Sequence, residues 1–153
     1  MSSPVHLDEI DKKILTILQS DARTPFSKIA RELGVSEATV FIRVKKMMKA
    51  GVIKGFRAVI SPQHVGKSLS AFVLVKADPR KYERVLEVIK RLDDVVEAYD
   101  VTGPYYAILK VVASDKEGLA KLIDAIGAVE GVLSTETAVV LREIKESSGI
   151  KLT

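Results

Sequence analysis

An internal repeat of 37 residues constrains the fold more than any other feature of this sequence. Asp78 and Asp115 each precede a run of apolar residues at helical spacing, and they lie 37 residues apart. Val95 and Val132 each begin a β-branched run, and they are separated by the same distance. A tandem repeat of strand, helix and strand predicts the order βαββαβ, which is the ferredoxin-like arrangement.

The elements of this second half follow from local patterns. Apolar residues at helical spacing predict one helix from Asp78-Pro79 to Leu92 and another to Ile126, and Ser114 with Glu117 fits a capping box for the latter. Strands are predicted over residues 70–77, 95–102, 105–113 and 132–143.

Helices on one face of such a sheet leave its other face uncovered. The strands are apolar on both alternations, so we expect apolar residues there, drawn from Phe72 or Val73, Ile108 or Leu109, and Val139 or Val140. An apolar sheet face predicts sheet-to-sheet dimerisation. The alternative is a sheet whose outer face is simply wet.

The first sixty residues show three short amphipathic helices. The first is predicted from about residue 8 to 20, capped by Asp8. The second starts with Thr24 as cap and Pro25 as first helical residue, and ends at Gly34. The third is capped by Ser36 and ends at Gly51, with an inner face formed by Val40, Val44, Met47 and Met48.

Two helices joined by a Gly-Val-Ser turn predict a helix-turn-helix. Cations on the outer face of the third helix would pair with phosphates, and small side chains near its start would approach base edges. The alternative is a generic three-helix bundle with a solvated basic face. The predicted DNA-binding residues are Ser36, Ala38, Thr39, Ile42, Arg43, Lys46 and Lys49.

The charge distribution agrees with this prediction. Residues 1–60 carry eleven Lys or Arg against six Asp or Glu, whereas residues 61–153 carry thirteen against fourteen. The net positive charge of the chain therefore lies in its first part, as expected for a nucleic-acid module joined to a neutral one.

The segment 52–60 is β-branched and predicts a further strand, before Ser61-Pro62 breaks the pattern. We therefore expect an α+β protein: a winged helix-turn-helix domain over residues 1–60, a linker over 61–68, and a ferredoxin-like oligomerisation and effector-binding domain over 69–153.

Composition excludes several classes. There is no cysteine, and His6 and His64 are the only histidines, so we expect neither a metal nor a cofactor. No apolar run is long enough to span a membrane, and the N-terminus is too polar for a signal peptide, which predicts a cytoplasmic protein without membrane partners. The absence of asparagine and of cysteine, with abundant Lys and Glu, indicates a thermophilic source.

Taken together, the motifs resemble the Lrp/AsnC (feast/famine) family of prokaryotic transcription factors over essentially the whole chain. The matching segments are LDEIDKKILTILQSDARTPFSKIARELGVSEATVFIRVKKMMKAGVIKGF, VTGPYYAILKVVASD and VEGVLSTETAVVLREIK. The resemblance implies a winged helix-turn-helix, a ferredoxin-like effector domain, homodimers that assemble into higher oligomers, and an amino acid or similar small metabolite bound between dimers.

The resemblance also assigns residues. Ser36 to Lys46 match the family's recognition helix, the turn Gly103-Pro104-Tyr105 matches the loop that approaches the effector, and Thr135 with Thr137 match a paired-threonine stretch facing it. Tyr106 occupies a place where the family usually has an acidic residue. Without the resemblance, Gly103-Pro104 could be only a hairpin turn, and the threonines only strand formers. The predicted effector-binding residues are Gly103, Pro104, Tyr105, Tyr106, Thr135 and Thr137.

We therefore predict a sequence-specific DNA-binding regulator, dimeric or larger, that recognises a pseudo-palindromic duplex and responds to a small metabolite. A ligand-independent architectural or autoregulatory binder is the alternative. A third hypothesis is an enzyme resembling siroheme decarboxylases, which share both domains. It is disfavoured because no histidine follows His64 and no arginine lies in the predicted hairpin.

Overall fold

The computed structural model describes residues 4–147 and 149–153, which form two compact units. The first comprises the described residues through Ala58 together with those from Lys145 onward, and the second spans Val59–Ile144. The C-terminal segment therefore belongs to the first unit, whereas the sequence analysis assigned everything from residue 69 to the second domain. Each unit is described by itself.

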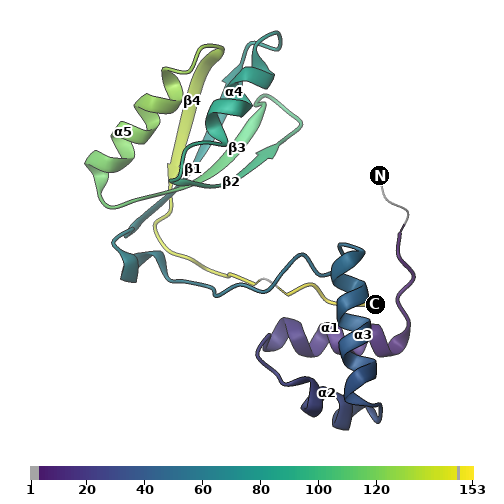
Figure 1. Ribbon diagram of the computed structural model, residues 1–153. Coiled ribbons are helices and arrows are strands. Elements are labelled where there is room, and N and C mark those ends of the chain that lie inside the picture. Colours follow the sequence, from purple (N-terminus) through teal and green to yellow (C-terminus); the bar gives the residue numbers. More distant parts are fainter. Residues whose placement is uncertain (1–3, 148) are drawn as a thin grey trace. The chain divides into compact units, whose positions relative to one another are not determined.

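Three helices form the first unit: α1 (Glu9–Ser20), α2 (Phe26–Leu33) and α3 (Glu37–Lys49) (Figure 1). Their amphipathic faces enclose one apolar core, because each helix turns its period-3.6 stripe inward. The fully buried centre of that core is made of Ile14, Ile29 and Val40.

The ends of these helices differ in part from the prediction. Asp8 caps α1 as expected, but Pro25 is the N-cap of α2, so the helix begins one residue later than expected. On α3 the inner face contains Met47, which is buried, whereas Met48 is 44% exposed. The assignment of Met48 to the inner face was wrong, because the buried stripe runs through Val40, Val44 and Met47 and the helical rotation puts Met48 at its margin.

The predicted strand over residues 52–60 is not formed in the described chain. The N–H groups of Val52 and Ile53 both donate to the carbonyl of Met47 and close the end of α3. The residues that follow have no pairing strand, and Val59 is 79% exposed. A β-branched run needs a neighbouring strand to hydrogen-bond with, and no described strand pairs with this one.

The second unit is a four-stranded antiparallel sheet with the order β2-β3-β1-β4. Its elements are β1 (Leu69–Ala77), α4 (Tyr82–Ile89), β2 (Val95–Asp100), β3 (Ala107–Ala113), α5 (Lys116–Gly127) and β4 (Val132–Val139), preceded by the short 3-10 helix Pro62–Val65. Both α-helices cover the same face of the sheet (Figure 1). The predicted βαββαβ order is thus confirmed.

Several helices and strands in this unit are shorter than expected. Helix α4 begins at Tyr82 because Asp78 accepts from the Arg80 N–H and forms a turn instead of a cap. The cap of α5 is Asp115, which accepts from the Gly118 N–H at 2.7 Å, so the capping box of Ser114 and Glu117 was wrong. Strand β4 ends at Val139, one residue before the last backbone hydrogen bond to β1, which the Val140 N–H donates to the Ser70 carbonyl at 2.9 Å.

Strand register decides which side chains lie on each face of the sheet. Ala71, Val73 and Val75 of β1 are buried beneath the helices. Val139 pairs with Ala71, so it lies on this covered face and not on the open one. The apolar residues of the open face include Phe72, Leu74, Ile108, Val112 and Ala138.

Candidate nucleic-acid interface and effector region

The turn between α2 and α3 has the geometry that a helix-turn-helix requires. Gly34 adopts φ 67°, a left-handed conformation that side-chain-bearing residues rarely adopt, and it ends α2. The Val35 N–H donates to the Ala30 carbonyl at 3.0 Å. Ser36 then caps α3 by accepting from the Thr39 N–H at 3.1 Å. The turn therefore places the start of α3 at a defined angle to α2.

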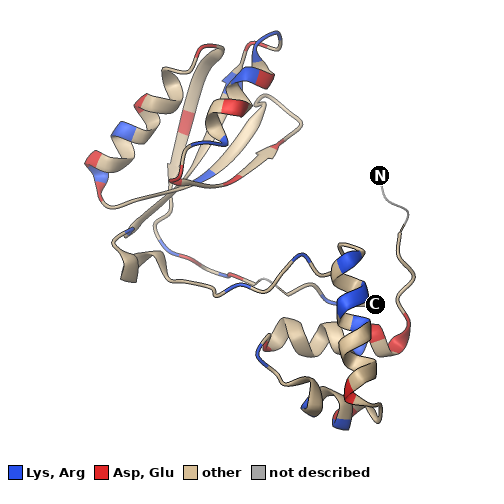
Figure 2. Cartoon of the chain, viewed as in Figure 1, with Lys and Arg blue, Asp and Glu red and all other residues tan. Residues whose placement is uncertain are grey.

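Helix α3 turns an uncovered stripe away from the core. Ala38, Ile42, Lys45 and Lys49 follow one another at spacings of four, three and four residues, and all four are exposed. Ile42 is 62% exposed, although it is a large apolar residue. Figure 2 shows the basic residues gathered along α3. Small and apolar groups thus precede cations along this face.

Lys45 was missed by the sequence analysis. Its Nζ lies 5.9 Å from the centre of the exposed Phe41 ring, a cation–π contact at the edge of the stripe. The signal that could have found it is the i, i+4, i+7, i+11 spacing that begins at Ala38. Lys46, which the sequence analysis did name, is also exposed and borders the stripe.

Arg43 lies elsewhere than predicted. Its Nη1 is 2.6 Å from Asp8 Oδ2 and 3.0 Å from Asp11 Oδ1, and only 30% of its side chain is exposed. The hydrogen bond from Arg43 lowers the pKa of Asp8 to about 2, with help from the Asp11 N–H. The same pairing raises the pKa of Arg43. The expected outward cation is thus ion-paired within its own unit.

Ser36 and Thr39 are also engaged locally. Their hydroxyl oxygens lie 2.8 Å apart, and Ser36 caps the helix as described. Both residues therefore shape the start of α3, where the N–H groups of a helix attract anions.

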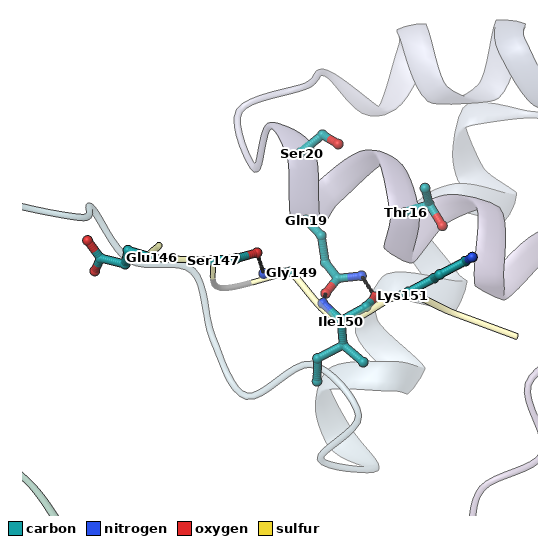
Figure 3. A pocket seen from close by; sticks show the side chains of 8 residues that line it. All are labelled: Thr16, Gln19, Ser20, Glu146, Ser147, Gly149, Ile150 and Lys151. Atoms are coloured by element: carbon teal, nitrogen blue, oxygen red, sulfur yellow. Dashed lines mark hydrogen bonds between the residues drawn. The ribbon is translucent and has the colours of Figure 1, made fainter. Parts of the chain in front are cut away.

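A second surface feature of this unit involves the C-terminal segment. The Gln19 side chain accepts from the Ile150 N–H at 2.6 Å and donates to the Ile150 carbonyl at 3.0 Å (Figure 3). These two bonds tie the segment to α1 beside an open hollow of about 440 Å³. The hollow is lined by Thr16, Gln19, Ser20, Glu146, Ser147, Gly149, Ile150 and Lys151.

The predicted effector turn lies between β2 and β3. Gly103 has φ 108°, and the Val101 N–H donates to the Tyr106 carbonyl at 3.1 Å, which closes the turn around Pro104. The Tyr106 N–H donates to the carbonyl of Val75. The hairpin is therefore anchored to the centre of the sheet.

The two tyrosines of this turn have different neighbours. The Tyr105 hydroxyl donates to Glu136 at 2.5 Å, and the Lys76 Nζ lies 5.4 Å from its ring centre. The carboxylate of Glu136 raises the pKa of Tyr105.

Tyr106 instead packs against Tyr82, with ring centres 5.0 Å apart. The Tyr82 hydroxyl donates to Asp100 and to the Tyr106 carbonyl. Burial, followed by the carboxylate of Asp100, raises the pKa of Tyr82.

Thr135 and Thr137 pair with Val75 and Val73, so they lie on the helix-covered face, half-buried. Glu136, between them, lies on the open face, and it is the residue that the turn reaches. Within the described chain the recorded contacts of the turn thus lead to Glu136 and not to the two threonines.

Residues 4–147 and 149–153 contain neither a candidate metal site nor a membrane-spanning helix. No group of three His, Cys, Asp or Glu is arranged to hold a metal ion in that part of the chain. No helix there is long and apolar enough to cross a membrane.

The fold and the α3 surface define a helix-turn-helix protein with a separate sheet domain. Two family models match: the AsnC-type helix-turn-helix domain over residues 7–48 and the Lrp/AsnC ligand binding domain over residues 70–150. The chain belongs to the Lrp/AsnC family of transcriptional regulators.

Individual relatives agree. The HTH-type transcriptional regulator FL11 of Pyrococcus horikoshii is 39% identical over 97% of this chain and 98% of its own length. Ptr1 of Methanocaldococcus jannaschii is 41% identical over 93% of this chain and 97% of its own length. The structure of E. coli AsnC superposes with a TM-score of 0.88 at 34% identity, covering 94% of this chain and 98% of that one.

These relatives settle the class of protein. It is a transcriptional regulator and not an enzyme, so the hypothesis of a siroheme decarboxylase is set aside. The predicted thermophilic source fits relatives from Pyrococcus.

Proposed function

We propose that this regulator binds double-stranded DNA by inserting the exposed stripe of α3 into the major groove. The observation that carries the proposal is the order of groups along that stripe. Ala38 and Ile42 lie toward the start of α3, where helix-turn-helix proteins contact base edges. Lys45 and Lys49 follow toward its end, where cations would reach phosphates.

The apolar groups indicate how sequence would be read. An exposed Ile42 has a methyl surface that complements the C5-methyl of thymine. Ser36 and Thr39 stay at the helix start, where they stabilise the end that faces the duplex. Lys46 and Lys49 supply sequence-independent affinity.

The protein is proposed to act as a homodimer that assembles further. The open sheet face carries Phe72, which is 39% exposed, together with Leu74, Ile108 and Ala138. Such a face favours pairing with the same face of a second copy. A two-fold dimer would present two α3 helices, so the operator is expected to be pseudo-palindromic.

The second unit is proposed to bind an amino acid or a similar small metabolite. The match of residues 70–150 to a ligand binding domain supports this. The backbone N–H groups of Gly103 and Tyr105, on either side of Pro104 in the turn, are proposed to meet the ligand carboxylate, and Thr135 with Thr137 to complete the site between dimers. Tyr106 packs on Tyr82 where family members usually carry an acid, so the ammonium needs another partner.

A salt titration tests the DNA proposal. The full chain is titrated onto a duplex that it selected from a random-sequence library, at several salt concentrations. Affinity is expected to fall steeply with salt, and Lys45→Ala or Lys49→Ala should each lower the logarithmic salt slope by about one. Lys121→Ala, on α5, is the control. A salt-independent affinity, or equal slopes for all variants, contradicts the proposal.

The ligand proposal has its own test. Calorimetry against the twenty amino acids is paired with sedimentation, because a ligand between dimers shifts the oligomer distribution. Thr135→Val and Gly103→Asp are expected to abolish the heat. If no amino acid binds at millimolar concentration, or if both variants bind normally, the ligand-independent regulator becomes the better description.

A further inference from the structure

We propose that Arg43 is a positioning residue that holds α3 against the start of α1, and that Asp8 and Asp11 are therefore required for sequence-specific DNA binding although both are acidic. The inference deepens the proposed function and rests on it. From the sequence, Arg43 was predicted to contact DNA directly, and this inference replaces that role with a structural one.

The three side chains form one network. Arg43 Nη1 donates to Asp8 Oδ1 at 2.8 Å, to Asp8 Oδ2 at 2.6 Å and to Asp11 Oδ1 at 3.0 Å. The same two carboxylates cap α1: Asp8 Oδ1 accepts from the Asp11 N–H at 2.9 Å, and Asp11 Oδ2 accepts from the Asp8 N–H at 3.2 Å. Arg43 thus joins α3 to the capping box of α1.

Charge decides against a phosphate contact. Two carboxylates surround one guanidinium, so the cluster carries a net charge of −1. A phosphate that approached Arg43 would come close to both carboxylates, and like charges repel strongly at that range. By contrast, none of the ion pairs recorded among the described residues involves Lys45, Lys46 or Lys49.

The network also has the geometry of a positioning device. Arg43 stands three residues after Val40 and four before Met47, so it flanks the buried stripe and not the exposed one. The apolar core holds α1 and α3 together without fixing their direction, because the hydrophobic effect is non-directional. A guanidinium held by two carboxylates does fix direction. Base contacts from Ile42 depend on that direction.

The sign of the charge effect provides the test. Asp8→Asn removes one negative charge but retains a good N-cap, so α1 still forms. Glu9→Gln removes one negative charge from the neighbouring residue, whose side chain is 81% exposed and pairs only with Lys12 in the recorded contacts. Electrostatics alone predicts that both variants bind DNA more tightly. A positioning role for Arg43 instead predicts that Asp8→Asn weakens DNA binding and that Glu9→Gln does not.

The experiment compares full-length variants on two probes: the duplex that wild type selected from a random library, and a mixed-sequence duplex of equal length. Asp8→Asn is expected to bind the selected duplex about 3- to 30-fold more weakly, as coupled charge networks imply. Glu9→Gln should bind it no more weakly than wild type. On the mixed-sequence duplex both variants should match or exceed wild type, since only phosphates are contacted there.

Arg43 variants add a second readout. Arg43→Ala is expected to lose preference for the selected duplex while keeping the wild-type salt slope, and Arg43→Lys to restore part of that preference. Circular dichroism checks folding, and if Arg43→Ala does not fold, the comparison of Asp8→Asn with Glu9→Gln decides alone.

Two results overturn the inference while leaving the proposed function intact: tighter binding of the selected duplex by Asp8→Asn, or a salt slope lowered by about one in Arg43→Ala, which is the signature of a lost phosphate contact. A wild-type chain that binds neither duplex overturns both proposals. If Lys45→Ala and Lys49→Ala each lower the salt slope by about one in the same assay, the proposed DNA-binding function is supported whether or not Arg43 is a positioning residue.

Discussion

The side-chain amide of Gln19 bonds both the N–H and the carbonyl of Ile150, which lies 131 residues further along the chain. An amide is the side chain that can satisfy a backbone N–H and a backbone carbonyl together. Through this pair the C-terminal segment becomes part of the helical unit, although the intervening chain forms the sheet.

Gln19→Ala should release this segment. Each hydrogen bond contributes about 0.5–1.5 kcal/mol, so the free energy of unfolding of the helical unit is expected to fall by roughly 1–2 kcal/mol. Hydrogen exchange of the Ile150 amide should accelerate in Gln19→Ala and remain slow in Ser20→Ala, a neighbouring change on α1. Equal protection in the two variants would show that the pair does not hold the segment.

Ile42 is expected to read a thymine methyl group. Replacing individual thymines of the selected duplex by uracil should weaken wild-type binding at one position by about 1 kcal/mol, the loss of a buried methyl group. In Ile42→Ala the same replacement should have no effect, because the partner surface is gone. Additive effects of the two changes at every thymine would contradict this contact.

Gly131 is predicted to tolerate no side chain. It has φ 104°, and an added Cβ would lie 2.8 Å from Lys81 Cβ and 2.9 Å from Val85 Cγ2. Gly131→Ala should therefore destabilise the sheet unit by about 1–3 kcal/mol. Gly127→Ala, within α5 with no atom within 4 Å of the added Cβ, should be neutral or stabilising. Urea unfolding of both variants measures the difference, and equal midpoints would contradict it.

The ion pair of Asp8 predicts a pH dependence. Its pKa is about 2 in the folded chain against an ordinary value of 3.8, so the folded state binds fewer protons and its stability rises with pH across that interval. The contribution is complete above pH 4 and is lost as the pH falls toward 2. Carbon-detected NMR titration should give a pKa of about 2 for the Asp8 carboxyl group, and Arg43→Ala should return this pKa toward its ordinary value of 3.8. A wild-type value near 3.8 would refute the pairing in solution.

The open sheet face is expected to hold the dimer. Leu74→Lys should convert dimers into monomers in sedimentation, because a charge cannot be buried unpaired in an apolar interface. Val88→Lys, which places the same charge at an exposed apolar position of α4, should leave the dimer intact. Dimers that survive Leu74→Lys would require a different interface.

Local pattern was enough for most of the fold. The period of 3.6 over α1 and α3 and the Gly34 turn each involve residues near one another in sequence, and the 37-residue repeat is visible because the same local pattern occurs twice. The segment 52–60 shows the limit, since β-branched residues favour a strand but a strand needs a neighbour. The inner face of α3 shows it again, because Met47 and Met48 look equivalent in sequence and only packing separates them.

Part of the candidate DNA-binding site could also be predicted from the sequence. The helical stripe at Ala38 and Ile42, and the lysines that follow it, are readable from spacing, although Lys45 was overlooked.

The two-domain class and the cationic helix therefore follow from local patterns in the sequence. Packing decides which cation is exposed, which face of the sheet carries Thr135, and with which unit the C-terminal segment packs. Arg43 and Asp8 are 35 residues apart, and Gln19 and Ile150 are 131 apart. Side-chain pairing across such distances depends on how the helices pack, and local periodicity contains no information about it.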